Sequence, residues 1–306
     1  MYKIINNDSL LALEELEENS IDSIVTDPPY ELNFMGKGWD NAGISFNKEI
    51  WQKCLRVLKP GGYLLAFGGS RTFHRIAVAI EDAGFEIRDT IMWLYGGGFP
   101  NTKSNGGKTT MPDLRDVGKK SKKAIGIDKL SFGQVSNVDR KESTYIAPCD
   151  SGSAARYFYC AKASKKDRDD GLEEFETKSH EEINNRKEGS AGATRQYGGG
   201  TNPFLSVSCP RKNTHPTVKP TELMQYLVRL VTPKGGTILD PFMGSGSTGK
   251  AVMFENKERN ADYSFIGIER EKEYCDIAEA RISFASKYEI PKEEKNQISF
   301  ADLLDG

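Results

Sequence analysis

The stretch TILDPFMGSGSTG at residues 237–249 decides the fold class of this chain. Its start, Thr237 to Leu239, is a short apolar run that indicates a buried parallel strand. Asp240 follows directly, and the glycine-rich segment after it leads into a helical pattern. Open α/β sheets bind ligands just beyond the carboxyl ends of their strands, so this unit predicts such a sheet with a ligand beside Asp240.

The glycine-rich turn indicates a nucleotide-like cofactor without identifying it. Residues 244–249 match Gly-x-Gly-x-x-Gly, in which glycines let the backbone approach a ligand and the next helix N-terminus favours an anionic group. Glu269 ends the next expected strand, where an acid can hold ribose hydroxyls. These residues alone do not separate NAD from S-adenosylmethionine.

A second strand-ending acid lies near the start of the chain, in the tetrad Asp27-Pro28-Pro29-Tyr30 after the apolar run 24–26. Such a tetrad suits the activation of an exocyclic base amine, which is a poor nucleophile because its lone pair is delocalised into the ring. The Asp27 carboxylate and a backbone carbonyl, held in place by the two prolines, would localise that lone pair on the nitrogen. A tyrosine face suits stacking of a flipped base. A plain strand-ending turn is the alternative, since Asp-Pro-Pro favours turns.

A third polar segment, residues 213–220, precedes an expected helix and is bounded by prolines. Its polar groups suit the carboxylate or amine of an amino-acid moiety. His215 within it is either a catalytic base or, as a lone histidine, a packing and hydrogen-bonding residue. The histidines and cysteines of the chain show no metal-ligand spacing, so we expect no metal site.

The expected elements form a parallel sheet assembled from both ends of the chain. Between Gly96 and Lys212 the apolar periodicity is mostly lost, which is typical of a functional or disordered insert. We therefore divide the chain into a catalytic half (1–100), a target-recognition insert (101–212) and a cofactor half (213–306). Strands are expected at 2–6, 21–26, 63–67, 85–94, 155–161, 237–240 and 264–268, and helices at 9–18, 46–58, 71–83, 221–231, 247–255 and 271–285.

Composition is that of an ordinary soluble protein, 37% hydrophobic and 28% charged. No apolar run reaches the roughly 18 residues that span a bilayer, and the first residues lack the apolar core of a signal peptide. Five cysteines without a Cys-x-x-Cys pair favour reduced thiols, so we expect a cytoplasmic protein. Residues 101–168 carry 15 basic and 7 acidic side chains, which favours DNA phosphate contacts or, alternatively, a solvated basic loop.

Three motifs, in this order, resemble the β-class DNA amino-methyltransferases, which methylate adenine at N6 or cytosine at N4. They are Asp-Pro-Pro-Tyr at 27–30, His-Pro-Thr-x-Lys-Pro at 215–220 and Asp-Pro-Phe-x-Gly-Ser-Gly-Ser-Thr at 240–248. The resemblance covers residues 1–100 and 213–306 and extends into 155–164. It implies an α/β, Rossmann-like methyltransferase fold, circularly permuted so that the catalytic half comes first.

The resemblance also implies site residues. Asp27 and the Pro28 carbonyl would bind the target amine beside Pro29, with Tyr30 stacked on the base. Asp8 would face the cofactor's adenine, Glu269 its ribose, and residues 215–219 its methionine. The implied S-adenosylmethionine pocket consists of Asp8, His215, Thr217, Lys219, Asp240, Phe242, Gly244, Ser245, Gly246, Ser247, Thr248 and Glu269. From the charge pattern, the candidates for DNA phosphate contacts are Arg115, Lys119, Lys120, Lys122 and Lys123.

We expect a site-specific enzyme that flips an adenine out of double-stranded DNA and methylates N6 directly from S-adenosylmethionine, without a metal. In the resembling class an Asp at the first tetrad position favours adenine, and N4-cytosine methylation is the alternative. An NAD-dependent oxidoreductase is a more distant alternative, which leaves residues 27–30 and 213–220 unexplained. A DNA-binding regulator without catalysis would show an eroded tetrad. A homodimer and a cognate endonuclease are left open.

Overall fold

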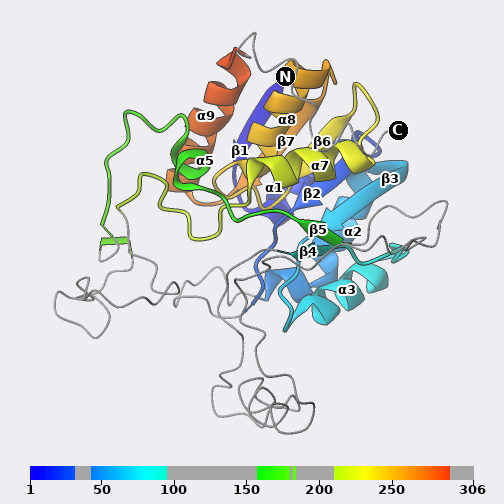
Figure 1. Cartoon of the computed structure of the whole chain (residues 1–306). Helices are drawn as coiled ribbons and strands as arrows, with labels where there is room; N and C mark the ends of the chain where they lie inside the picture. Colours follow the sequence, from blue (N-terminus) through cyan, green and yellow to red (C-terminus); the bar gives the residue numbers. More distant parts are fainter. Residues whose placement is uncertain (32–42, 95–156, 180–181, 184–209, 290–306) are drawn as a thin grey trace, which may run out of the picture.

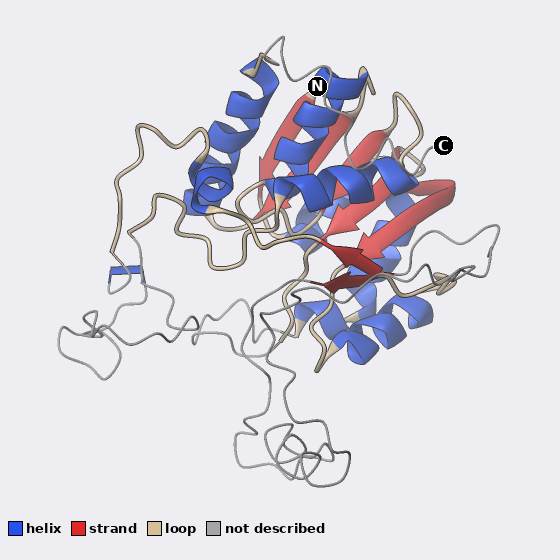
Figure 2. Cartoon of the chain, viewed as in Figure 1, coloured by secondary structure: helices blue, strands red, loops and turns tan. Residues whose placement is uncertain are grey.

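The computed structural model describes residues 1–31, 43–94, 157–179, 182–183 and 210–289. Its centre is a five-stranded sheet with the order β1-β7-β6-β2-β3 (Figures 1 and 2). Every neighbouring pair is parallel, so the carboxyl ends of all five strands meet at one edge of the sheet. The strands are β1 (Tyr2–Asn6), β2 (Ile21–Thr26), β3 (Leu58–Ala66), β6 (Thr237–Asp240) and β7 (Ser264–Glu269).

Helices cover both faces of the sheet, which makes a three-layer α/β fold. Val25, Ile238 and Phe265 pack into the core on one face, whereas Ile24 and Leu239 pack into the core on the other. Alternate residues of a strand face opposite cores, which is why the strands read as continuous apolar runs. The helices are α7 (Thr221–Val231), α8 (Ser247–Arg259) and α9 (Lys272–Lys287) on the first face, and α1 (Ser9–Glu15), α2 (Lys48–Val57) and α3 (Phe73–Asp82) with the 3-10 helix η3 (Ile44–Phe46) on the second.

The two ends of the chain meet within the sheet. β1 lies beside β7, with Tyr2 opposite Phe265. Further along, β2 joins the catalytic half to the cofactor half by pairing with β6, with Ile24 opposite Leu239. The residues that directly follow β2 and end β6 are therefore neighbours at the carboxyl edge of the sheet.

The expected α/β parallel sheet is confirmed, and β2, β6 and α7 have the expected bounds. The expected helix 9–18 is wrong at its end, because α1 stops at Glu15. Arg56 of α2 donates from Nη2 to the carbonyls of Leu13 and Leu16, at 2.6 and 2.8 Å. The Leu13 carbonyl also accepts from the amide of Leu16, the residue that caps α1, at 3.4 Å. A side chain from α2 thus adds hydrogen bonds at the early end of α1.

Residues 59–62, between the expected helix 46–58 and the expected strand 63–67, lie inside β3. The pairing of β2 with β3 is irregular there, since Ile21 faces Leu58 but Ser23 already faces Tyr63. The extra residues bulge opposite Asp22, whose carboxylate accepts from Lys59 Nζ at 2.8 Å. Turn-forming residues thus make a bulge within the strand rather than a separate connection.

Only part of the expected strand region 85–94 is a strand, β4 (Met92–Leu94). It pairs in parallel with β5 (Tyr157–Tyr159), which is shorter than the expected strand 155–161. A short helix, α5 (Lys165–Asp169), follows β5. Most of the expected insert 101–212 lies outside the described residues, so the domain bounds stay a prediction. Within the described part of the chain, no helix is long and apolar enough to span a bilayer.

Candidate active site

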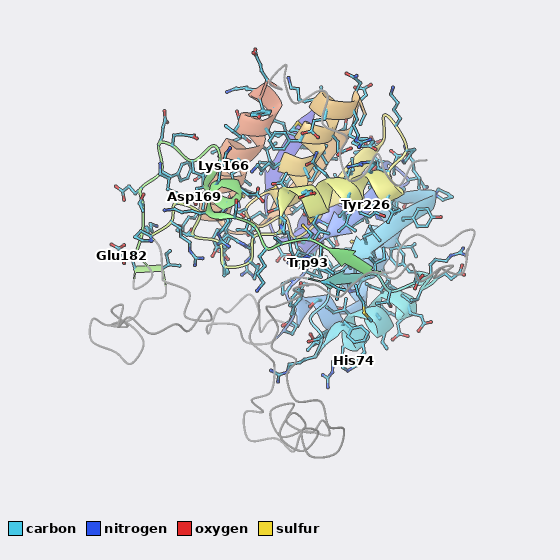
Figure 3. The ribbon with its side chains drawn as sticks, viewed as in Figure 1. His74, Trp93, Lys166, Asp169, Glu182 and Tyr226 are labelled. Atoms are coloured by element: carbon cyan, nitrogen blue, oxygen red, sulfur yellow. The ribbon has the colours of Figure 1, made fainter. Side chains whose placement is uncertain are left out.

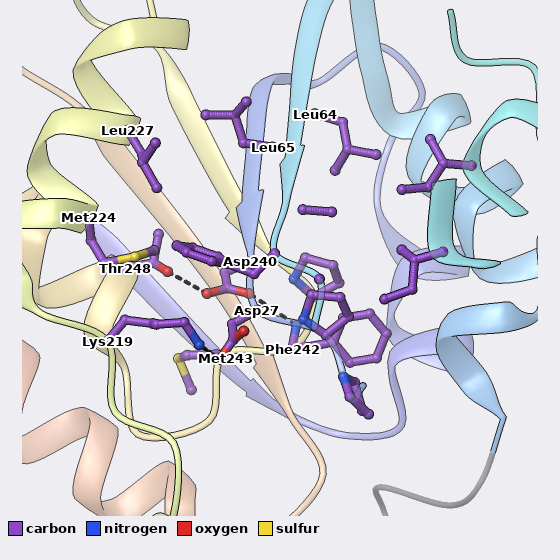
Figure 4. A pocket seen from close by; sticks show the side chains of 18 of the residues that line it. Asp27, Leu64, Leu65, Lys219, Met224, Leu227, Asp240, Phe242, Met243 and Thr248 are labelled. Atoms are coloured by element: carbon purple, nitrogen blue, oxygen red, sulfur yellow. Dashed lines mark hydrogen bonds and ion pairs between the residues drawn. The ribbon is translucent and has the colours of Figure 1, made fainter. Parts of the chain in front are cut away.

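A cleft of about 1970 Å³ begins at the carboxyl ends of the strands and continues along the edge strand β3 to its amino end. It is lined by the tetrad 27–30, by residues 240–245 and by residues 215–219. Figure 4 shows Asp27 and Asp240 close together, with Lys219 reaching toward Asp27. Two motifs from opposite ends of the sequence therefore open into the same space.

Both carboxylate oxygens of Asp27 have partners. Tyr30 donates its hydroxyl to Oδ1 at 2.8 Å, and the ammonium of Lys219 forms an ion pair with Oδ2. Lys219 is only 7% exposed. Its Nζ lies 4.7 Å from the ring centre of Phe67 and 5.6 Å from that of Tyr30. The lysine expected on the methionine side thus contacts the acid of the other motif, held by a carboxylate and two aromatic faces.

The tetrad is supported from η3 and α2. Ser45 donates its hydroxyl to the carbonyl of Pro29 at 2.5 Å, and the indole of Trp51 donates to the carbonyl of Ser45 at 2.9 Å. Trp51 is fully buried, and its ring also packs against Phe242 at 6.2 Å between ring centres. One buried tryptophan therefore supports both motifs. Sequence reasoning missed Ser45 and Trp51, although Trp51 stands among the apolar positions of the expected helix.

Asp240 is a buried carboxylate whose oxygens are used within the fold. Oδ1 accepts from the Thr26 hydroxyl at 2.6 Å and from the Phe242 amide at 3.1 Å, and Oδ2 accepts from the Thr248 hydroxyl at 2.5 Å. Burial raises the pKa of Asp240 to about 6, although these hydrogen bonds oppose the rise. Asp240 fixes β2, the turn and the start of α8 relative to one another, which suits a positioning role.

Two further acids at neighbouring strand ends line the cleft, Asp8 and Glu269. Glu269 accepts from the backbone amide of Gly244 at 2.9 Å and from that of Glu271 at 2.8 Å. Burial raises the pKa of Glu269 above its usual value. Asp8 accepts from the Leu10 amide at 2.9 Å and so caps α1. Glu269 therefore ties the glycine-rich turn to β7, and Asp8 stands at the end of the adjacent strand.

His215 has the surroundings of a packing residue. Its ring meets Tyr274 edge to face at 4.7 Å between ring centres. Burial, with the charges of Lys219, Arg168 and Arg281, lowers the pKa of His215 to about 3. A neutral imidazole with so low a pKa is a poor general base near neutral pH. Of the two interpretations of His215, the geometry favours packing over catalysis.

The glycines of the turn are required by protein contacts as well as by any ligand. A Cβ on Gly244 would lie 2.8 Å from Nε2 of His215. A Cβ on Gly246 would lie 2.9 Å from the Cβ and 3.0 Å from the Cα of Ala278 on α9. Gly244 lines the cleft, as do Thr217, Phe242, Ser245, Ser247 and Thr248, whereas Gly246 faces α9.

The segment after β5 is clamped to the cofactor half by a network that sequence reasoning missed. Lys250, 1% exposed, pairs with Asp167 at 2.8 Å and with Asp170 at 3.0 Å. Arg281, fully buried, donates to the carbonyls of Ser245 and Asp167 at 2.5 and 3.1 Å. The only sequence signal was a lysine and an arginine among apolar positions of expected helices.

A neighbouring acid of α5 extends this clamp to the polar segment 213–220. Asp169, labelled in Figure 3, accepts from the backbone amide of Asn213 at 3.1 Å. The guanidinium of Arg168 donates to the carbonyl of His215 at 3.0 Å. α5, which lies within the expected insert, thus contacts both the polar segment 213–220 and, through Arg281, the glycine-rich turn that lines the cleft.

The five candidates for phosphate contacts, Arg115, Lys119, Lys120, Lys122 and Lys123, lie outside the described residues. Among the described residues, no cluster of three or more histidines, cysteines or acids is placed to bind a metal ion.

A parallel α/β sheet whose acidic strand ends and glycine-rich turn share one cleft is typical of Rossmann-like enzymes with a nucleotide-like cofactor, methyltransferases among them. The chain belongs to the N6/N4 DNA methylase family, whose sequence model matches residues 21–280. It is a DNA methyltransferase. This membership favours S-adenosylmethionine over NAD as the cofactor, a choice that the glycine-rich turn left open, and it is at odds with an NAD-dependent oxidoreductase.

Individual relatives agree with the family. The chain is 28% identical over 297 residues to type II methyltransferase M.HpaI of Haemophilus parainfluenzae, covering 92% of this chain and 74% of the relative. It is 24% identical over 306 residues to type II methyltransferase M2.LlaDCHI of Lactococcus lactis subsp. cremoris, covering 93% and 90%. The structure of PvuII DNA methyltransferase (cytosine-N4-specific) superposes with a TM-score of 0.50 at 15% identity, covering 99% of this chain and 90% of that one. This last likeness concerns the fold alone.

Proposed function

We propose that this protein transfers a methyl group from S-adenosylmethionine to the N6 amine of an adenine that is flipped out of duplex DNA. The observation that carries the proposal is the shared cleft, in which the Asp27 tetrad and the Asp240 turn follow neighbouring strands. The names of the two relatives, both type II methyltransferases, support sequence-specific methylation alongside a restriction enzyme.

The cleft has the donors and acceptors that S-adenosylmethionine requires. Asp8 and Glu269 supply carboxylates at adjacent strand ends, which suit ribose hydroxyls and a cationic ligand. Phe242 supplies an apolar wall, and Ser247 and Thr248 stand at the start of α8. We assign these residues to the cofactor, with Thr217 and Ser245 near its methionine end, Asp240 and Gly246 as supports of the turn, and His215 as a neutral wall.

Each residue of the tetrad has a task in this reaction. S-adenosylmethionine, when bound, supplies an electrophilic methyl group on a positively charged sulfur. Asp27 and the Pro28 carbonyl accept the two amine hydrogens and so direct the nitrogen lone pair toward that carbon. As the nitrogen bonds to the methyl carbon, the carbon–sulfur bond would break and its electron pair would stay on the sulfur of the departing S-adenosylhomocysteine. The nitrogen becomes positive, and the Asp27 carboxylate, whose side chain is 17% exposed, stabilises this charge until the nitrogen loses one of its hydrogens as a proton. Tyr30 stacks on the base and orients Asp27, while Pro29 keeps the backbone rigid.

Cytosine N4 is the second candidate target, because its amine requires the same two acceptors. The Asp at position 27 favours adenine through the resemblance to β-class enzymes, whereas the PvuII enzyme with a similar fold is cytosine-specific by name. We also propose that the basic stretch with Arg115, Lys119, Lys120, Lys122 and Lys123 contacts DNA phosphates, which would position the duplex without reading its sequence.

The test compares two isosteric changes on β2 and its end. Asp27→Asn should lower the methylation rate at least about a hundredfold, because it removes the charge at the reacting amine. S-adenosylmethionine affinity, measured by titration calorimetry, should stay within an order of magnitude. Asp22→Asn is the matched control, because Asp22 lies near the amino end of β2, away from the tetrad. This variant should methylate DNA at the parent rate. Equal rates for the parent and Asp27→Asn would contradict the proposal, and single-molecule sequencing of the methylated DNA identifies the base.

A further inference from the structure

The position of Lys219 next to the Asp27 tetrad is fixed by its backbone as well as by its ammonium group. It lies between Val218, which is buried, and Pro220, which caps α7. The first residue of α7, Thr221, donates its amide to Asp167 at 3.0 Å and its hydroxyl to the same carboxylate. The position of Lys219 beside Asp27 is therefore set by a rigid, anchored segment.

The ammonium of Lys219 has donors to spare toward the cleft. A lysine carries three N–H donors, of which the Asp27 carboxylate takes one. Lys219 lines the cleft, and its Nζ lies over the faces of Phe67 and Tyr30. Asp27 and Lys219 thus present an acceptor and a donor side by side, next to aromatic faces on which a planar base can stack.

This arrangement complements one edge of an amino base. In adenine the N6 amine is a donor and the adjacent N1 is an acceptor, and cytosine presents the same pair with N4 and N3. Thymine and guanine present the reverse, a carbonyl oxygen next to an N–H. Enzymes that flip a base read this edge by hydrogen bonds. A carboxylate beside an ammonium therefore matches adenine and cytosine and opposes thymine and guanine.

We propose that Lys219 is a substrate-contacting residue that donates a hydrogen bond to the ring nitrogen beside the target amine. This inference rests on the proposed function and deepens it. The contact has two consequences for the reaction. It reads the base together with Asp27, and it occupies the ring-nitrogen lone pair, which is not delocalised and would otherwise compete with the amine for the methyl group.

The experiment is a double-mutant cycle between Lys219 and the ring nitrogen. Duplexes carry the mapped target site with either adenine or 1-deazaadenine, in which a C–H replaces N1; for a cytosine target, 3-deazacytosine replaces cytosine. Single-turnover methylation should be about ten- to a hundredfold slower on the deaza base for the parent, the effect of one charged hydrogen bond. Lys219→Met should be slowed to a similar degree on the natural base and should then methylate both bases at the same rate.

Two controls separate this role from others. Tyr30→Phe removes the other partner of Asp27 and should keep the full penalty for the deaza base, although it is a slower enzyme. Titration with S-adenosylmethionine should give the same affinity for Lys219→Met as for the parent, which also shows that the variant is folded. A loss of cofactor affinity with an unchanged deaza penalty would assign the lysine to the methionine carboxylate and overturn the inference.

The outcomes also separate this inference from the proposed function. A parent enzyme that methylates adenine and 1-deazaadenine equally fast overturns the role of Lys219 without any variant. An equal deaza penalty in the parent and Lys219→Met overturns it as well, while methyl transfer stands. If the parent methylates no DNA at all, the proposed function fails, and the inference fails with it.

Discussion

Gly246 offers a direct test of what the glycine-rich turn is for. Its backbone has a φ of +74°, and an added Cβ would lie 2.9 Å from the Cβ and 3.0 Å from the Cα of Ala278. Gly246→Ala therefore combines left-handed strain of roughly 1–2 kcal/mol with overpacking against a helix of roughly 1–3 kcal/mol. We expect the free energy of unfolding to fall by about 2–5 kcal/mol in total.

The matched control is Gly235→Ala. Gly235 has almost the same φ, +76°, but nothing lies within 4 Å of its added Cβ, so only the strain applies. Urea unfolding followed by circular dichroism should show Gly246→Ala less stable than Gly235→Ala by about 1–3 kcal/mol. Equal losses in the two variants would refute the idea that Gly246 is required by α9. They would instead indicate that Gly246 is required because the backbone approaches a ligand there.

Two further predictions concern buried charges. Burial raises the pKa of Asp240 from 3.8 to about 6, so the folded protein keeps a proton that the unfolded chain releases, and stability falls as pH rises through this range. Asp240→Asn lacks this titration and should gain about 3 kcal/mol relative to the parent between about pH 4 and pH 7 in urea unfolding, whereas parallel curves would contradict the assignment. Lys250→Met leaves Asp167 and Asp170 without their buried cation and should lower the free energy of unfolding by about 3 kcal/mol. Its control, Lys272→Met, removes an exposed lysine and should leave the urea midpoint unchanged; similar midpoints for both variants would argue against the network.

Short apolar runs bounded by strong turn residues made much of the sheet predictable. The strand at 237–240 and the helix at 221–231 have the expected bounds because each is fixed by local pattern, with Pro220 before the helix and Pro233 to Gly236 after it. The expected end of α1 is wrong because its last carbonyls are satisfied by Arg56, a side chain on another helix. Local pattern contains no information about such a partner.

The candidate site, like the fold, has features that local sequence predicts and features that it does not. Residue type and position at strand ends were enough to predict that Asp27 and Asp240 would lie at the carboxyl edge of one sheet. The ion pair between Lys219 and Asp27 joins residues that are 192 positions apart. The lack of room for a side chain at Gly244, next to His215, likewise depends on how the 213–220 segment returns across the cleft. Such pairings follow from the path of the chain in space, which the sequence pattern does not specify.

The pairing of β1 with β7 has a consequence for synthesis. Tyr2 leaves the ribosome long before its partner Phe265, and at typical elongation rates the interval is roughly 13–50 s. During that time β2 can pair with β3, but its other edge, which later receives β6, is open. Open strand edges on a waiting chain are sites of aggregation. Expression yield of this enzyme should therefore depend on elongation rate and chaperone supply more than on the stability of the finished fold.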